Sequence, residues 1–185
     1  MKSEQWGKAI LAAYRNLEPI CNILDDLVLK KGVKSREAGF DTDGTIKVME
    51  GMIELTERKI KFINLKLIIE NTIKVMEENI SKYLVFRFMD CFSYQTIAKM
   101  TDSSLRTAQR RVAKALTKFG HTLKSLGFGG AYLEEKYGNE PLILGVLDQF
   151  SKDKRLAKPT ERNVKLKTDA VFFSPRMSMN SYIEI

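Results

Sequence analysis

Apolar residues recur at alternating steps of three and four along most of the first 80 positions, and this spacing constrains the fold more than any other feature. It is the spacing of residues on one face of an α-helix. The alternation of apolar and polar residues that marks a half-buried strand is not the prevailing pattern. The 185-residue chain is therefore predicted to be all-α. The first stripe comprises Ile10, Tyr14, Leu17, Cys21, Leu24 and Val28.

The first helix is expected to cover about residues 3 to 31. Ser3 can cap its amino end. Gly32 follows two lysines and is typical of a helix carboxyl end. Pro19 lies inside the apolar pattern and lacks a backbone N–H, so it predicts a kink or a break near residues 17–18.

A second, long helix is expected to begin near Gly44 and to carry two successive apolar stripes. Such stripes can pack on the first helix as an antiparallel hairpin, or on another subunit as a short coiled coil. Packing within the chain is the simpler expectation. Residues 1–80 are therefore predicted to form a helical hairpin used for packing or dimerisation. The first stripe is Ile46, Met49, Ile53, Thr56, Ile60, Ile63 and Leu67, and the second is Ile69, Ile73, Met76 and Ile80.

The charge of the chain favours a polyanionic partner. Its formal net charge is +8 and its pI is near 9.4. Between residues 103 and 133 there is no Asp or Glu, whereas a solvated helix face normally mixes both signs. The cations of this segment are Arg106, Arg110, Arg111, Lys114, Lys118 and Lys124.

Residues 81–127 are predicted to form a helix-turn-helix domain. Ser93 can cap its first helix, which Ile97 and Ala98 would bury, and Ser104 can cap its second helix. Asp102 lies in the turn between them and tolerates a positive φ better than most residues. Met100 is expected to supply an apolar contact there. The second helix has an apolar stripe of Ala108, Val112, Ala115, Leu116 and Phe119, extended by Leu123 and Leu126.

The opposite side of the second helix suits a DNA groove. Arg106 and Arg110 can each donate two hydrogen bonds to guanine, and Gln109 can pair with the edge of adenine. Leu105 can touch a thymine methyl group. Lys114 and Lys118 suit phosphate. Arg111 lies beside the buried stripe, where an internal pairing is the alternative. The predicted DNA-binding residues are Ser104, Leu105, Arg106, Thr107, Gln109, Arg110, Ala113, Lys114 and Lys118.

Three segments of this region resemble region four of bacterial sigma factors, which recognises the −35 promoter element. They cover about residues 80–120, and the order of a long helical segment and such a module is similar to small sigma-like regulators of Gram-positive bacteria and their phages or mobile elements. That family usually has Gly where this chain has Asp102, and apolar residues at Thr101 and Ser103. The segments are Tyr83-Leu-Val-Phe-Arg-Phe-Met, Phe92-Ser-Tyr-Gln-Thr-Ile-Ala and Ser104-Leu-Arg-Thr-Ala-Gln-Arg-Arg-Val-Ala-Lys-Ala-Leu.

Other classes of function find little support in the residues. His121 is the only histidine and follows Gly120 on the basic helix. Cys21 and Cys91 are far apart, so free thiols are expected and a zinc site is not. No catalytic residue, metal site or cofactor is predicted, nor is an enzyme. No apolar run approaches the roughly 20 residues that span a bilayer, so the expected location is the bacterial cytoplasm, with no membrane partner.

The sequence therefore predicts an all-α protein with an N-terminal long helical hairpin, a helix-turn-helix and an irregular tail. The tail, residues 128–185, is expected to contain one short helix beginning at Pro141. The leading functional hypothesis is a sequence-specific transcription regulator that binds double-stranded DNA. One alternative is a sigma-type factor that recruits core RNA polymerase, and another is a helical phage assembly or DNA-packaging adaptor. A homodimer is compatible with the first hypothesis.

Overall fold

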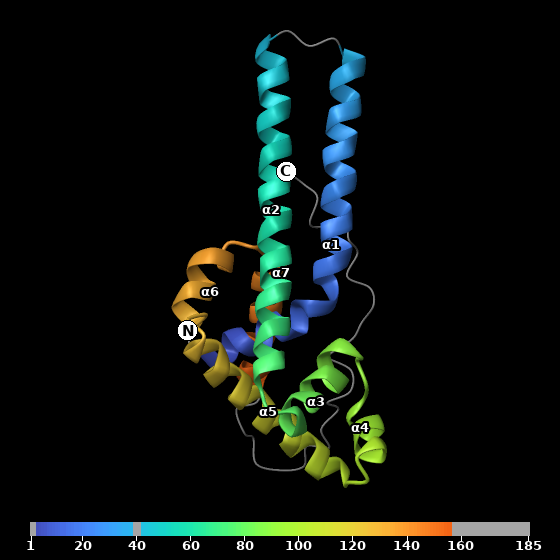
Figure 1. Ribbon diagram of the computed structural model, residues 1–185, viewed down its shortest axis with the longest axis vertical. Helices are drawn as coiled ribbons and strands as arrows, with labels where there is room; N and C mark the ends of the chain where they lie inside the picture. The colour runs from blue at the N-terminus through green and yellow to red at the C-terminus, as the bar shows by residue number, and fades with distance from the viewer. Residues whose placement is uncertain (1–2, 39–41, 157–185) are drawn as a thin grey trace.

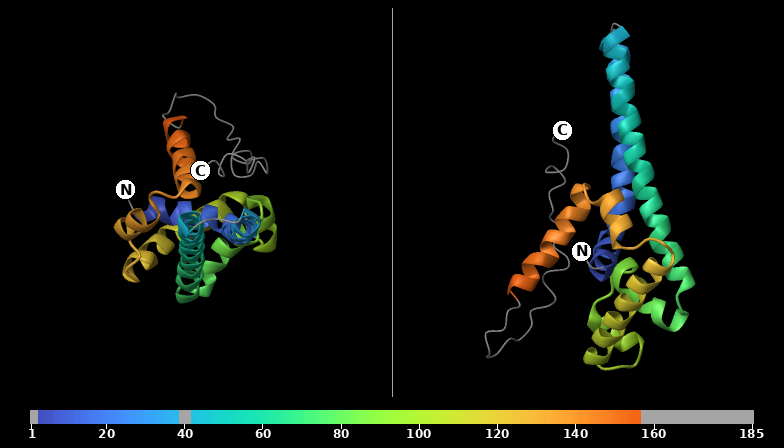
Figure 2. Two further views of the ribbon diagram at one scale, coloured as in Figure 1. Left: turned by 90° about the horizontal axis from the view of Figure 1, so that it is seen from above. Right: turned by 90° about the vertical axis from the view of Figure 1, so that its left-hand side faces the viewer.

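The computed structural model describes residues 3–38 and 42–156 of the chain (Figure 1). All the secondary structure of these residues is helical, which confirms the predicted all-α fold. A long hairpin projects from a smaller helical body, and the helix-turn-helix lies at the end of the molecule opposite the hairpin tip (Figures 1 and 2). The elements are α1 (Ser3–Ala38), α2 (Thr42–Val75), α3 (Glu78–Leu84), the π-helical segment η1 (Val85–Met89), α4 (Tyr94–Met100), α5 (Leu105–Ser125), α6 (Gly130–Tyr137) and α7 (Pro141–Leu156).

Helix α1 is one continuous helix that bends. Pro19 lies inside it without interrupting it, and Figure 1 shows that the helix changes direction along its length. Of the two predicted outcomes, a kink or a break, the structure shows a bend without a break. Proline removes one backbone hydrogen bond, but the buried face of the helix keeps the chain helical on both sides of it. Gly32 does not end the helix as expected, since α1 continues to Ala38 and α2 begins at Thr42.

Helix α2 packs on α1 through a different face from the one predicted. The first stripe, from Ile46 to Leu67, was expected to pack within the chain, but its apolar members are exposed. That expectation is wrong because α2 carries apolar residues on two faces and α1 covers only one of them. The second stripe is buried as far as Met76, and Ile80 is half-buried. The buried apolar residues of α2 are Phe62, Leu65, Ile68, Ile69 and Ile73.

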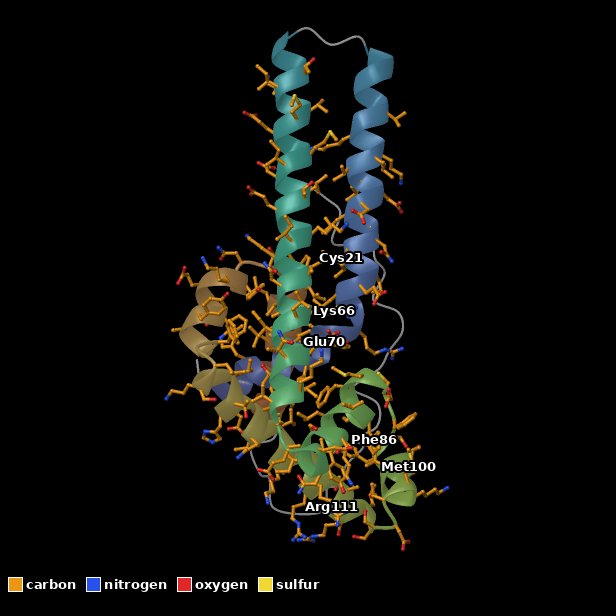
Figure 3. All side chains as sticks on the ribbon, in the orientation of Figure 1. Cys21, Lys66, Glu70, Phe86, Met100 and Arg111 are labelled. Atoms are coloured by element: carbon orange, nitrogen blue, oxygen red, sulfur yellow. The ribbon has the colours of Figure 1, made fainter. Side chains whose placement is uncertain are left out.

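Polar contacts join the two arms of the hairpin at three levels. Nζ of Lys59 lies 2.6 Å and 2.7 Å from the two carboxylate oxygens of Asp25. Nζ of Lys66 donates to Glu18 over 2.9 Å. The hydroxyl of Tyr14 donates to the carboxylate of Glu70 over 2.7 Å. Burial and this hydrogen bond raise the pKa of Tyr14 to about 12. Figure 3 shows that Lys66 and Glu70 lie on the same stretch of α2.

A single buried cluster runs through the hairpin base and the helix-turn-helix. Trp6 and Ile10 of α1 belong to it together with Phe119 of α5, Leu84 of α3 and Ile97 of α4. The base of the hairpin and the helix-turn-helix therefore share one core, so the orientation of α5 depends on α1.

Residues 128–156 correct the expectation of an irregular tail with one short helix. They contain two helices, α6 and α7, whose inward side chains join the core: Leu133, Tyr137, Ile143 and Leu147 are buried. The rest of the predicted tail, residues 157–185, lies outside the described residues. Burial and the neighbouring Tyr132 and Glu140 raise the pKa of Tyr137 to about 12.

Glu140 attaches the α6–α7 junction to α2. Its carboxylate is nearly buried, accepts a hydrogen bond from Nε of Arg58 over 3.0 Å, and lies 4.0 Å from Nζ of Lys61. A buried charge is costly when its partner is lost, so this ion pair should matter more than the exposed pairs of the hairpin.

We expect Arg58→Met to destabilise the protein by about 1–3 kcal/mol, because it leaves the Glu140 carboxylate without its main donor. Adding Glu140→Gln should recover part of the loss. Urea unfolding of the two single variants and the double variant gives the coupling energy. The control is the exposed Lys66–Glu18 pair, for which a coupling of about 0.5 kcal/mol or less is expected. Equal coupling in the two pairs would contradict the role given to Glu140.

Candidate nucleic-acid interface

Helices α4 and α5 begin with the same cap. The side chain of Ser93 accepts a hydrogen bond from the backbone N–H of Thr96 over 3.0 Å, and Ser104 accepts one from the N–H of Thr107 over 3.2 Å. In each pair the two hydroxyl oxygens are also 2.9 Å apart. These bonds satisfy amide groups that the first turn of a helix leaves without partners. Both predicted caps are confirmed, and Thr107 takes part in the second one through its N–H and its hydroxyl.

The turn between the two helices is a Schellman motif with Asp102 at its left-handed position. Asp102 has φ 44°, and its N–H donates to the carbonyl of Lys99 while the N–H of Ser103 donates to that of Ala98. The hydroxyl of Thr101 donates to the carbonyl of Ile97 over 2.8 Å and lies 2.9 Å from the hydroxyl of Ser103. The polar turn thus closes through its own hydrogen bonds.

Met100 does not supply the apolar contact that was expected of it. Its side chain is more than half exposed at the end of α4, and Figure 3 shows it on the outside of the molecule. Ile97 and Ala98 are buried as predicted and provide the contact between α4 and α5.

The inner side of α5 agrees with the predicted stripe over most of its length. Ala108, Val112, Ala115, Phe119 and Leu123 are buried, and Leu116 is half-buried. Leu126 is exposed because the helix ends before it, so the stripe stops at Leu123. This inner side contacts α1, α3 and α4, which fixes the direction in which the outer side faces.

The outer side of α5 presents most of the predicted DNA-binding residues to solvent. Leu105, Arg106, Gln109, Arg110 and Ala113 recur at steps of one, three and four, so they lie on one side of the helix. No acidic residue interrupts this side over the length of α5. The predicted residues that are exposed are Ser104, Leu105, Arg106, Gln109, Arg110, Ala113, Lys114 and Lys118, whereas Thr107 is half-buried in its capping role.

Two cations of α5 have partners within the chain. Nη1 of Arg111 donates to the hydroxyl of Tyr83 over 2.8 Å, and its guanidinium carbon lies 5.6 Å from the centre of the Tyr83 ring. The internal pairing that was the alternative for Arg111 is thus the one observed, at the lower edge of the body in Figure 3. Lys118 forms a looser ion pair, 3.8 Å from the carboxylate of Glu77, with both side chains largely exposed.

Lys114 lies between these two pairs, at the junction of α3 and α5. It lines a shallow depression together with Glu77, Lys82 and Arg111, among other residues. The predicted phosphate-binding lysines are therefore on one flank of α5, and the predicted base-reading residues are beside them on its outer side.

The link from α3 to α4 is held by Arg87. Its Nη1 donates to the carbonyl of Phe92 over 3.0 Å, and its guanidinium carbon lies 4.4 Å from the centre of the Tyr94 ring. Phe86 packs against Phe92 with ring centres 6.0 Å apart. Cys91 turns the chain with φ 58°. This link sets the position of α4 against the body.

The amino-terminal part of α1 supports the carboxyl-terminal half of α5, which sequence reasoning missed. Glu4 accepts a hydrogen bond from the hydroxyl of Thr117 over 3.0 Å. A methyl group at Gly7 would lie 3.3 Å from the Phe119 ring, so the two helices approach closely there. The indole N–H of Trp6 donates to Glu134 over 3.0 Å. The only sequence signal for this contact was the placement of Trp6 and Gly7 in the first turns of an amphipathic helix.

Comparisons of the chain with protein-family models, with curated proteins and with solved structures found no match. Within residues 3–38 and 42–156, no group of side chains is arranged to hold a metal ion. In the same ranges, none of the helices combines the length and the apolar character that crossing a bilayer requires.

We expect Asp102→Gly to stabilise the protein by up to about 1 kcal/mol, because glycine adopts positive φ without the strain of a side chain. For a chain of this size, that corresponds to a rise in Tm of about 2–4 °C. Thermal unfolding followed by circular dichroism measures it. The control is Asp90→Gly, whose φ of −84° gives glycine no such advantage. If Asp102→Gly lowers Tm as much as the control does, the positive φ at this turn is contradicted.

Proposed function

We propose that the protein is a sequence-specific DNA-binding transcription regulator that reads the major groove with α5. The observation that carries this proposal is the exposed outer side of the amino-terminal half of α5. Arg106, Gln109 and Arg110 are exposed there on a side without acidic residues, while the opposite side of the helix is buried in the core. In helix-turn-helix proteins, the amino-terminal residues of the second helix contact base edges.

The dimensions of the element support the proposal. An α-helix with its side chains is about 10–12 Å across, and the major groove of B-DNA is about 12 Å wide. Arg106 and Arg110 provide bidentate donors for guanine, and Gln109 provides an amide for adenine. Leu105, which is 43% exposed at the first turn of α5, suits a thymine methyl group.

The flanking lysines suit the phosphate backbone. Lys114 is exposed on the flank of α5, and the loose Lys118–Glu77 contact can exchange for a phosphate. Five or six phosphate contacts would give a slope of roughly −5 in a plot of log affinity against log salt concentration. A regulator of this kind would act in the bacterial cytoplasm, at the nucleoid, and the resemblance to sigma region four makes a promoter the natural target.

A selection from random duplex DNA tests the proposal. We expect the wild-type chain to enrich a defined motif. Arg106→Ala with Arg110→Ala should lose the motif, because each good arginine–guanine pair contributes about 1–3 kcal/mol of discrimination. Arg111→Ala also removes an arginine from the same helix, but one whose side chain is bound to Tyr83. This control should select the same motif and show lower thermal stability instead.

Two results would contradict autonomous sequence reading. One is binding without any enriched motif, which fades as salt rises. The other is a motif that survives loss of both arginines. In either case, a pull-down with core RNA polymerase separates a sigma-type factor from a packaging adaptor, because only the former should retain the polymerase.

A further inference from the structure

Seven residues of α2 form an exposed apolar seam along the hairpin. The six apolar members are between 40% and 57% exposed. Monomeric soluble proteins rarely expose a contiguous apolar patch of this kind, and such patches mark interaction sites. The residues, hereafter the α2 seam, are Ile46, Met49, Ile53, Thr56, Ile60, Ile63 and Leu67.

The α2 seam has the spacing of a coiled coil. Its members alternate steps of three and four without interruption for about three heptads, a length of about 33 Å at 1.5 Å per residue. In heptad notation, the a positions are Ile46, Ile53, Ile60 and Leu67, and the d positions are Met49, Thr56 and Ile63. A straight helix packed only within its own chain does not need this strict repeat.

The seam faces away from every neighbour that α2 has in the described residues. Phe62 and Ile69 are buried against the hairpin partner, and Arg58 and Lys61 face Glu140 at the α6–α7 junction. The heptad positions of the seam are on the remaining side. Viewed from above, α2 is at the edge of the molecule (Figure 2).

The distal part of the hairpin has no third layer to bury it. Among the described residues, the buried apolar side chains of the two arms reach only as far as Leu24 and Phe62 towards the tip. Most helical stability in proteins comes from packing an apolar face against another element. Two helices alone bury too few apolar side chains in this distal part to stabilise helices of this length.

We propose that the α2 seam pairs with the same seam of a second copy of this chain, as a parallel two-stranded coiled coil. A seam that repeats one residue class is self-complementary, which is what a two-fold interface requires. Isoleucine at three of the four a positions, with no isoleucine at two of the three d positions, is compatible with two strands. The hydroxyl of Thr56 already donates to the carbonyl of Met52 over 2.8 Å, so it enters the seam without an unsatisfied hydrogen bond.

The charges beside the seam select the parallel arrangement. The e positions carry Glu50 and Glu57, and the g positions carry Lys59 and Lys66. In a parallel pair, residues at g face residues at e of the second copy, so these glutamates do not face glutamates. An antiparallel pair would set e against e and would bring these glutamates together, whereas Lys59 and Lys66 are already paired within the chain with Asp25 and Glu18.

The dimer has a consequence that rests on the proposed function. Both copies of α5 would lie at the same end of the pair, related by a two-fold axis along the hairpins. If α5 reads DNA, the selected motif would then contain two half-sites about one helical turn, or a multiple of it, apart. The dimer itself is tested without DNA, so its failure and the failure of DNA reading are separate results.

Sedimentation equilibrium of the full chain, without DNA and at micromolar concentration, tests the pairing. We expect a mass about twice the 21.2 kDa of the chain. Ile53→Lys with Ile60→Lys should weaken association by roughly 100-fold or more, because four apolar side chains per dimer are replaced by like charges. Since both positions are half exposed in the single chain, helical content and Tm of the dissociated protein should show that it is still folded.

The matched control is Leu29→Lys with Val33→Lys on α1. These two side chains are 67% and 55% exposed, comparable to or more exposed than the seam residues, but they are on the other arm of the hairpin. This variant should remain dimeric. A wild-type chain that stays monomeric, or a dimer that survives the changes at Ile53 and Ile60, would overturn the proposal.

Oxidative cross-linking tests the orientation. In a parallel pair, Met49 lies beside Met49 of the second copy, so Met49→Cys should form an intermolecular disulfide. Glu54→Cys, on the same helix but off the seam, should not, and the wild-type chain controls for Cys21 and Cys91. A dimer in which Met49→Cys fails to cross-link would overturn the parallel arrangement.

Discussion

The close packing of α1 on α5 is the contact on which the rest of the structure depends. Gly7 and Gly120 are both buried where the two helices meet, and a side chain at Gly7 would press on Phe119. Trp6 closes the same region and ties it to α6 through Glu134. This contact holds the carboxyl-terminal half of α5, and α3 and α4 also pack on the helix, so that its buried side is fixed and Arg106, Gln109 and Arg110 are exposed.

The helix-turn-helix was predictable because local rules decide it. A serine before each helix, a strong apolar stripe on α5 and an Asp suited to positive φ specify the element within about 30 residues. The five cations and amides proposed for DNA follow from the same stripe, because residues opposite a buried face must be exposed. The internal pairing of Arg111 was open from sequence, since it depends on Tyr83, which is distant in the chain.

The sequence-based predictions were wrong where the structure of a segment depends on residues distant in the chain. An irregular tail was expected to begin at residue 128, directly after Gly127. Gly127, with φ 87°, instead forms a second Schellman turn: its N–H and that of Phe128 bond to carbonyls of Lys124 and Leu123. The turn redirects the chain into α6. Leu133 and Ile143 are buried in the same core as residues of α1. This burial depends on a helix distant in the sequence, so the local pattern of residues 128–156 does not predict it.

The packing of α2 also depended on a distant partner, and it leaves an apolar face available for binding. Periodicity identified two apolar faces but could not say which one α1 would cover. The choice follows from Phe62, Leu65 and Ile69, which add bulk on one side, and from the Lys59–Asp25 pair beside them. The face left over keeps a strict heptad repeat that folding of the single chain does not use. Ile73 and Met76 anchor the end of α2 in the core next to α3, so a second copy bound to that face would be joined to the helix-turn-helix through the same core.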